Sequence, residues 1–275
     1  MRTELVQAIE HAYRTGDASE SLVLELIDAL ERGEARAAEP DPNSPTGWRV
    51  NQWVKEGILL GFRLGKLTPM HWGGVAFQDR HLYPPRALAL SDGVRIVPGG
   101  TSIRRGACLR EGVVVMPPAY VNVGTYVGEG TMIDSHVLVG SCAQIGACVH
   151  LSAGCQIGGV LEPVGALPVI IEDNALIGGC SGVFEGTVVK RGAVIGAGVI
   201  LTRSLPLYDL VHERVIRAEG DMPLVVPEHA VVVAGSRPAS GAFAQQLGVQ
   251  IYAPVIVKYR DERTNAAVAL EEALR

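Results

Sequence analysis

The chain has 275 residues; 48% are hydrophobic, 19% are charged, only 5% are aromatic, and 33 are glycine. So much apolar content excludes a disordered chain, and the net charge of −5 gives no electrostatic basis for a nucleic-acid or anionic-membrane partner. No apolar run reaches the roughly 20 residues that a membrane-spanning helix needs, and the first residues lack a signal-peptide core. The five cysteines are odd in number without a CxxC pair, which is typical of reduced thiols. We therefore expect a cytoplasmic protein without membrane or nucleic-acid partners.

The first 66 residues show the apolar spacing of amphipathic helices. One stripe begins at Leu5 and a second at Leu22, the latter with Ser19 or Ser21 as its N-cap. A third helix is predicted over 50–64.

Turn-forming residues separate the third helix from the first two. The stretch 39–47 (EPDPNSPTG) reads as a linker, and residues 67–94 show no clean period. We predict an N-terminal helical domain over residues 1–94.

From Val97 onward an aliphatic residue recurs at every sixth position. The first run consists of Val97, Ile103, Leu109, Val115, Val121, Val127, Ile133, Val139, Ile145, Leu151 and Ile157. The phase breaks once, over 158–170, and the second run consists of Ile171, Ile177, Val183, Val189, Ile195 and Leu201. The fifth residue of each hexad is usually small or β-branched, and the fourth is often glycine. A phase held this long indicates a structural repeat.

Hexads of this kind predict a parallel β-helix. Three hexads make one coil of about 18 residues, and coils stack about 4.8 Å apart. The aliphatic and fifth residues point inward, glycine serves corners that need positive φ, and the narrow interior explains why aromatic residues are scarce. The phase break predicts a loop that leaves the coil, and 206–224 predicts a second excursion.

The fold class predicted is therefore mainly β. The β-helix is expected over 95–235, with a last partial coil over 226–232. A small C-terminal β extension is expected over 236–275, with a strand over 250–258 and a short helix over 266–275. The flat sides of such a prism favour packing against copies of itself, so we expect a homotrimer whose sites lie in grooves between protomers.

Several motifs go beyond the bare repeat. They are YVNVGTYVGEGTMID at 120–134, VGSCAQIG at 139–146, VHLS at 149–152, IGGVLEP at 157–163 and IIEDN at 170–174, with QWVK at 52–55, RIVP at 95–98 and PVIVK at 254–258. Together they resemble the tetrahydrodipicolinate N-succinyltransferases of diaminopimelate and lysine biosynthesis, which are hexapeptide-repeat acyltransferases. The resemblance covers most of the chain, and it implies left-handed winding of the β-helix.

This resemblance implies a reaction. Succinyl-CoA donates its acyl group to the amine of L-2-amino-6-oxopimelate, the opened and hydrated form of tetrahydrodipicolinate. The implied partners are a small dicarboxylate and a coenzyme A thioester, with no metal and no permanently bound cofactor. The chemistry needs a deprotonated amine, a held thioester and cations for the dicarboxylate.

Two residues match the family's functional positions. Asp134, the second residue of its hexad, matches the substrate-binding and catalytic aspartate, and Arg95 matches the substrate-binding arginine, whose guanidinium can grip a carboxylate in bidentate fashion. Arg104 and Arg105 are weaker candidates for the other carboxylate. The non-functional alternative for Asp134 is a solvated aspartate in a turn, and for Arg95 it is a surface ion pair.

One position departs from the family pattern. The family carries a second functional carboxylate where this chain has Gly182, whereas Glu185 matches a different, neighbouring glutamate. Either Glu185 substitutes, or a carboxylate from another strand or subunit does, or the proton path differs.

Outward residues supply further candidates. Coil arithmetic stacks Asp134, Ser152, Glu172 and Lys190 in one outward column, which is either a plain polar face or part of the groove wall. His136 and His150 are candidate general bases, and the alternative for each is a structural or substrate-binding role. The candidate contacts for coenzyme A are Arg203, Gly235, Arg237 and Lys258.

Other functions remain open on the same scaffold. The nearest is an acyltransferase with acetyl-CoA as donor or with a different amine acceptor. A zinc carbonic anhydrase needs three converging histidines, but only His136 and His150 lie on the main hexad runs. A non-catalytic β-helix would need neither Asp134 in GTMID nor the 158–170 loop.

Overall fold

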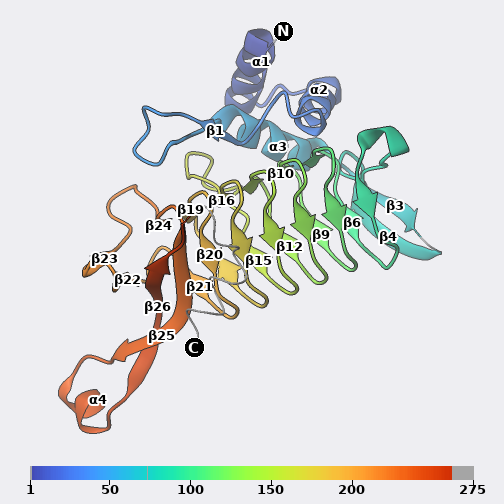
Figure 1. Ribbon diagram of the computed structural model, residues 1–275. Helices are drawn as coiled ribbons and strands as arrows, with labels where there is room; N and C mark the ends of the chain where they lie inside the picture. Colours follow the sequence, from blue (N-terminus) through green and yellow to red (C-terminus); the bar gives the residue numbers. More distant parts are fainter. Residues whose placement is uncertain (1, 73, 262–275) are drawn as a thin grey trace.

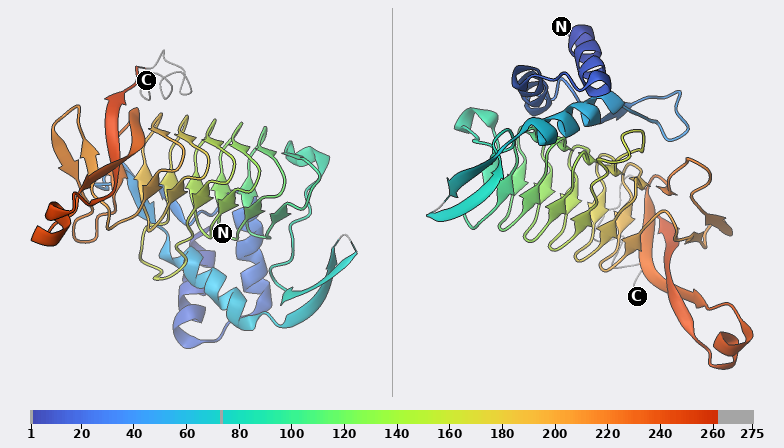
Figure 2. Two further views of the ribbon diagram at one scale, coloured as in Figure 1. Left: turned by 90° about the horizontal axis from the view of Figure 1, so that it is seen from below. Right: turned by 180° about the vertical axis from the view of Figure 1, so that it is seen from behind.

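A three-sided coil of parallel strands forms the body of the molecule. Helices pack along one edge of the coil, and a two-stranded ribbon projects from its C-terminal end (Figures 1 and 2). The computed structural model describes residues 2–72 and 74–261. The helix predicted over 266–275 lies outside these residues. The architecture is mainly β with parallel strands, as the hexads predict.

Each side of the coil is one sheet, and we name the sides after a strand in each. The β10 face holds β7 (Cys108–Leu109), β10 (Tyr126–Val127), β13 (Gln144–Ile145), β16 (Ile170–Ile171), β19 (Val188–Val189) and β24 (Val225–Val226). The β12 face holds β6 (Ser102–Ile103), β9 (Tyr120–Val121), β12 (Leu138–Val139), β15 (Gln156–Ile157), β18 (Gly182–Val183) and β21 (Ile200–Leu201). The β11 face begins with β5 (Arg95–Ile96), β8 (Val114–Val115), β11 (Met132–Ile133), β14 (His150–Leu151), β17 (Leu176–Ile177) and β20 (Val194–Ile195).

The hexad residues point inward, as predicted, and their stacking fills the coil. Ile133, Ile145 and Leu151 each expose 0% of their surface, and they form one cluster with fifth-position residues such as Ala143 and Val149. Burial of an aliphatic side chain of this size stabilises a fold by about 1.5–3 kcal/mol. The stacked interior is therefore the main source of stability.

The corners between faces adopt positive φ at the fourth hexad position. Glycine fills many of them, as predicted, because it has no Cβ to clash there. His136, Cys142, Cys148 and Cys180 take the same conformation, with φ between 53° and 67°. All five cysteines are free thiols, and burial raises the pKa of Cys142 to about 12. Three of the five cysteines, Cys142, Cys148 and Cys180, thus occupy corner positions of the coil.

The phase assigned to the first hexad is wrong. Ile96, not Val97, pairs with Val115. The next corner contains Gly99 and Gly100, both at positive φ, and this wider turn takes up one extra residue. The regular repeat therefore begins at β6.

The phase break is a loop that leaves the coil between β15 and β16, as predicted. Gln144 pairs with Tyr126 18 positions before it but with Ile170 26 positions after it, so the loop adds eight residues. The next hexad follows the loop directly.

Three N-terminal helices pack against the coil where the β12 and β10 faces meet. Ser19 caps the second helix, since its hydroxyl accepts a hydrogen bond from the Leu22 N–H at 3.3 Å. Val123 and Cys142 of the coil join the apolar cluster of the helices. The elements before the coil are α1 (Arg2–Thr15), α2 (Glu20–Glu31), β1 (Ala38–Pro40), β2 (Trp48–Val50), α3 (Gln52–Leu64), β3 (Leu67–Trp72), β4 (Val75–Arg80) and the short 3₁₀ helix η1 (Leu90–Asp92). Among the described residues no helix has both the length and the hydropathy to cross a bilayer.

The C-terminal strands extend the β11 face into a ribbon. The predicted strand over 250–258 is present, and the boundary proposed at 235/236 falls within a strand that continues the sheet. The elements are β22 (Leu207–Asp209), β23 (Arg214–Ile216), β25 (Ala230–Pro238), α4 (Ala242–Gln246) and β26 (Gln250–Tyr259).

A buried carboxylate ties these strands together. Asp209, 1% exposed, accepts hydrogen bonds from Tyr259 Oη at 2.7 Å and Arg214 Nε at 2.9 Å, and it contacts His212 Nδ1 at 3.0 Å. Burial alone would raise the pKa of this carboxyl, but the hydrogen bonds from Tyr259, His212 and Arg214 outweigh burial and hold the pKa below its usual range.

We predict that Asp209 contributes stability above about pH 4, the ordinary range of an unfolded aspartate, and that this contribution is lost as the pH falls below that range. Asp209→Asn should lower the free energy of unfolding at pH 7 by roughly 2 kcal/mol and flatten the acid limb. Urea unfolding of both proteins between pH 3 and pH 7 measures this. Parallel acid limbs would contradict the assignment.

Candidate functional site

The two residues predicted to bind the acceptor lie near one another on the coil. Arg95 is exposed on the β11 face, in register with Val114 of β8, which in turn pairs with Met132 of β11. Two strand spacings, about 10 Å, separate Arg95 from Met132. Asp134 follows β11 directly, at the edge where the β11 face turns into the β12 face. The fold thus places a cation and an anion on the same side of the coil, about two strands apart.

Asp134 is held by its own turn and faces an imidazole. Its side chain is 31% exposed, and Oδ1 accepts a hydrogen bond from the Ser135 N–H at 2.7 Å. Oδ2 lies 4.0 Å from Nε2 of His150, which stands on the β11 face one coil further along. Beneath them, burial and the charge of Asp134 raise the pKa of Cys155 to about 12, so this thiol stays protonated. One carboxylate oxygen is therefore anchored and the other is available.

The outward column predicted from Asp134 is correct for one step and then wrong. Asp134 and Ser152 stack as predicted, because Met132 pairs with His150. The next stacked residue is Gly178, since Leu151 pairs with Ile177. The prediction added only two residues for the phase break, whereas the loop inserts eight residues at one corner of the coil. Glu172 and Lys190 therefore lie on a different edge of the coil.

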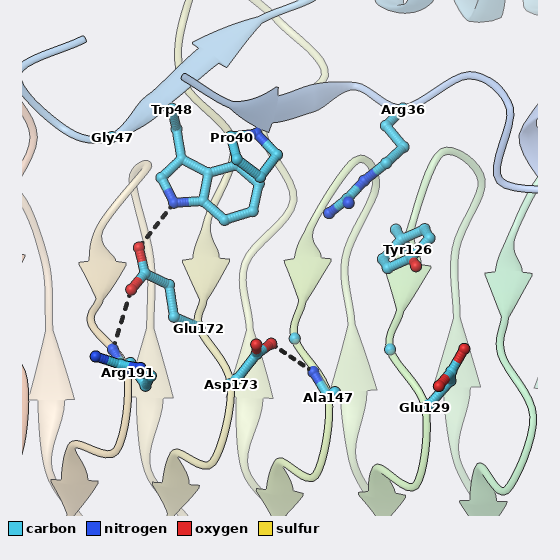
Figure 3. Close-up of a pocket in the computed structure, with 12 residues that line it drawn as sticks. Arg36, Pro40, Gly47, Trp48, Tyr126, Glu129, Ala147, Glu172, Asp173 and Arg191 are labelled. Atoms are coloured by element: carbon cyan, nitrogen blue, oxygen red, sulfur yellow. Dashed lines mark hydrogen bonds between the residues drawn. The ribbon is translucent and has the colours of Figure 1, made fainter. Parts of the chain in front are cut away.

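Glu172 and Lys190 instead anchor the β1–β2 hairpin. Glu172 Oε1 accepts a hydrogen bond from Trp48 Nε1 at 2.8 Å, and its Oε2 accepts one from the Arg191 N–H at 3.0 Å (Figure 3). Glu172 Oε1 also accepts a hydrogen bond from Lys190 Nζ at 2.8 Å. Lys190 also donates to the Thr46 carbonyl at 2.6 Å. These charges stabilise the packing of the hairpin on the coil.

A cavity of about 400 Å³ lies beside this anchor, under the hairpin. Arg36 enters it and stacks over the Tyr126 ring, with Cζ 3.7 Å from the ring centroid. Asp173 accepts a hydrogen bond from the Ala147 N–H at 2.7 Å (Figure 3). Glu172 and Asp173 thus form hydrogen bonds with the hairpin and the coil, and neither Asp134 nor Arg95 lines this cavity.

A larger cavity, about 1030 Å³, lies between the 158–167 loop and the edge where the β12 face meets the β10 face. Phe184 and Pro223 give it apolar walls, and Arg203 is the cation among its lining residues. The loop is fixed from outside by Lys55 of α3, a fully buried side chain whose Nζ donates to the Ala166 carbonyl at 2.5 Å. This cavity has the size and mixed character of a ligand site.

The Phe184 ring occupies the space above Gly182. A Cβ built on Gly182 would lie 2.2 Å from Cε2 of Phe184 and 3.1 Å from Cδ1 of Ile200. The same ring lies 2.9 Å from the Cβ position of Gly158. The wall at this point is thus aromatic, and no side chain fits at position 182 while the ring stays in place. Sequence reasoning noticed the glycine but missed the phenylalanine two residues later.

The predicted coenzyme A contacts fall into two groups. Arg203 borders the larger cavity, where its backbone N–H donates to Glu185 Oε2 at 2.9 Å and its guanidinium to the Gly220 carbonyl. Gly235, Arg237 and Lys258 lie on the β25–β26 ribbon.

Within the ribbon, each of these residues has a different setting. A Cβ on Gly235 would meet Val255 Cγ2 at 2.6 Å, so glycine there permits strand packing. Arg237 has a buried Nε without a hydrogen-bond partner among the described residues. Lys258 pairs in register with Val231, which continues the β11 face.

The weaker arginine candidates are committed to the fold. Arg104 pairs with Asp79 and stacks near Phe62. Arg105 pairs with Asp28 at 2.5 Å and with Glu31 at 3.2 Å. His136 is exposed at its corner. Among the described residues, no three His, Cys, Asp or Glu side chains group as metal ligands would.

Two family models match the chain. Residues 4–64 match the model described as tetrahydrodipicolinate N-succinyltransferase N-terminal, and residues 168–203 match the model described as hexapeptide repeat of succinyl-transferase. The two matches fall on the helices and on the coil after the loop, respectively.

Relatives that match almost the whole chain carry the name 2,3,4,5-tetrahydropyridine-2,6-dicarboxylate N-succinyltransferase, among them those of Granulibacter bethesdensis and Xylella fastidiosa. The Granulibacter bethesdensis protein is 45% identical, with 95% of this chain and 91% of its own covered. The Xylella fastidiosa protein is 41% identical, with 100% and 99% covered. A solved structure from Campylobacter jejuni shares the fold at a TM-score of 0.53 and 14% identity, covering 94% of this chain and 65% of that one.

The contact between Gly182 and Phe184 makes a testable prediction. Gly182→Glu should lower stability by about 1–3 kcal/mol, because the new Cβ displaces the ring. The same change in a Phe184→Val background should cost less than 1 kcal/mol. Thermal unfolding of the wild type, both single variants and the double variant measures the coupling. Equal costs in both backgrounds would contradict the interlock.

Proposed function

The chain belongs to the 2,3,4,5-tetrahydropyridine-2,6-dicarboxylate N-succinyltransferase family, and we propose that it transfers the succinyl group of succinyl-CoA to the amine of L-2-amino-6-oxopimelate. The observation that carries the proposal is the whole-chain similarity to relatives of that name at 41–45% identity. This is a CoA-dependent acyl transfer in the lysine and diaminopimelate pathway. The position of Asp134 and Arg95 on one outer face supports it.

We infer that Asp134 receives the acceptor amine and that Arg95 holds one acceptor carboxylate. An aspartate with one free oxygen can orient an amine and take its proton. A guanidinium pairs with carboxylates through two parallel hydrogen bonds, and no described side chain forms an ion pair with Arg95. The amine then attacks the thioester carbonyl, the C–N bond forms, the C–S bond breaks, and coenzyme A leaves as its thiol.

The arrangement of the β12 face supports a site shared between protomers. Asp134 lies at one edge of this face, and the larger cavity, with Phe184 and Arg203, lies at the other. Six residues of extended chain separate the edges, up to about 20 Å. One acceptor amine and one thioester cannot bridge them within one coil. A homotrimer, in which Asp134 of one protomer faces the loop of the next, brings the two edges together.

We propose that the thioester occupies the larger cavity of that groove. Arg203 offers a cation there, and Arg237, with its unpartnered Nε, offers a second one for a phosphate of coenzyme A. Gly235 and Lys258 complete the proposed contacts.

We also propose that the coil winds left-handedly and that the chain divides into the parts 1–94, 95–235 and 236–275.

The experiment is thiol release with succinyl-CoA and acetyl-CoA side by side, with and without the cyclic imine acceptor. We expect acceptor-dependent release with succinyl-CoA. Faster release with acetyl-CoA would favour the alternative donor, and release only with another amine would favour the alternative acceptor. No acceptor-dependent release with either donor would overturn the proposal.

Asp134→Asn should lower kcat by about 10²- to 10³-fold, because the amide cannot accept the proton. Asp134 lies at an outer edge of the coil and its side chain is 31% exposed, so the fold and the proposed trimer should be preserved. Steady-state kinetics and sedimentation measure both effects. Near-normal turnover would remove Asp134 from the mechanism.

Arg95→Ala should raise the acceptor KM by about 10- to 100-fold, since charge-assisted hydrogen bonds contribute about 1.5–3 kcal/mol. The KM for succinyl-CoA should change less than about twofold. Separate titration of each substrate makes the distinction. Equal effects on both substrates would reject the carboxylate contact.

A further inference from the structure

We propose that His150 is a positioning residue that acts through Asp134, taking over the proton that the carboxylate removes from the amine. The inference rests on the proposed function and deepens it. The sequence alone does not decide whether His150 has a structural or a catalytic role.

The geometry around His150 carries the proposal. Nε2 is buried and has no hydrogen-bond partner among the described residues. The acidic oxygen facing it is Oδ2 of Asp134, at 4.0 Å. Since buried ring nitrogens in folded proteins are normally paired, an unpartnered one beside a carboxylate points to a contact completed when substrate binds. Catalytic hydrogen bonds are often long before that and shorten in the complex.

The exposure of the ring fits a relay rather than a buried core role. The His150 side chain is 44% exposed although Nε2 is not, so the exposed area lies on the rest of the ring. One edge of the imidazole therefore faces Asp134 and another faces solvent. Asp134 Oδ1 is fixed by the Ser135 N–H, which keeps Oδ2 directed toward the ring.

Register explains why these two side chains meet. His150 of β14 pairs with Met132 of β11 in the β11 face. Asp134 is the residue directly after Ile133, the last residue of β11. The buried Cys155 thiol remains protonated and does not compete for the proton. Arg95 is the cation further along the same face. Besides Asp134, the ionisable groups around His150 on this side of the coil thus include the Arg95 guanidinium and the neutral Cys155 thiol.

Amide formation from an ammonium and a thioester releases one proton overall. An ammonium acceptor loses one proton to become nucleophilic, and its amine loses a second as the amide forms. The thiolate takes up one proton, so one is released to solvent. We assign the transfer from nitrogen to Asp134 Oδ2, then to His150 Nε2, with the solvent-facing edge releasing the other ring proton. An imidazole has two ring nitrogens, so it can take up a proton at one and release a proton from the other.

His150→Gln tests the relay, with His11→Gln on the exposed surface of α1 as the matched control. We expect kcat to fall about 100-fold at pH 7.5, the acceptor KM to change less than threefold, and the acid limb of kcat/KM against pH to disappear. The control should match the wild type in all three. An unchanged acid limb with kcat within threefold of the wild type would overturn the proposal.

A second measurement does not depend on the folding of the His150 variant. In protein labelled with ¹⁵N-histidine, L-2-aminopimelate, which carries the amine and both carboxylates, should shift the His150 ring signals, and Asp134→Asn should abolish that shift. A shift that persists in Asp134→Asn, or none in the wild type at saturation, would reject coupling through Asp134. If wild-type enzyme shows no acceptor-dependent thiol release, the proposed function fails instead.

Discussion

The stacking of inward aliphatic residues at 18-residue intervals is the constraint on which the rest of the structure depends. It fixes the register of the strands in the coil, because a shift by one residue would turn Ile133 or Ile145 out of the core. Rigid register in turn determines which outward residues share an edge. Asp134 and His150 meet because their strands are neighbours in the stack, although 16 positions separate them in sequence.

The departures from regular stacking create the larger cavity. The eight inserted residues form its outer wall, and buried Lys55 holds that wall by its hydrogen bond to Ala166. Phe184 forms an inner wall because Gly182 leaves space for its ring. The ordinary coils provide a stiff support, and the irregular segments give it a shape that ligands can occupy. The reaction surface we propose is complete only when two coils face each other.

Most of the fold was predictable from the sequence because one period governs it. The hexads gave the inward residues, the glycine corners and the loop, and the Ser19 cap followed from local chemistry. The predictions for the start of the repeat and for the column beyond Ser152 were wrong. A six-residue period does not show how many extra residues a corner contains. Ion pairs of Arg104 and Arg105 with distant acids, and the position of the Phe184 ring, depend on side-chain packing between segments that no period connects. Asp134 and Arg95 were found through motif resemblance, whereas the setting of His150 Nε2 depends on how β11 and β14 stack in the folded coil.

The central claim is that Asp134 at one edge of the β12 face meets the loop-lined cavity of a neighbouring copy. A structure of the protein with coenzyme A and L-2-aminopimelate tests it directly. The account predicts the sulfur beside Phe184 of one protomer and the amine within hydrogen-bond distance of Asp134 of the next. Both ligands bound to a single coil, or the sulfur under the β1–β2 hairpin, would contradict it.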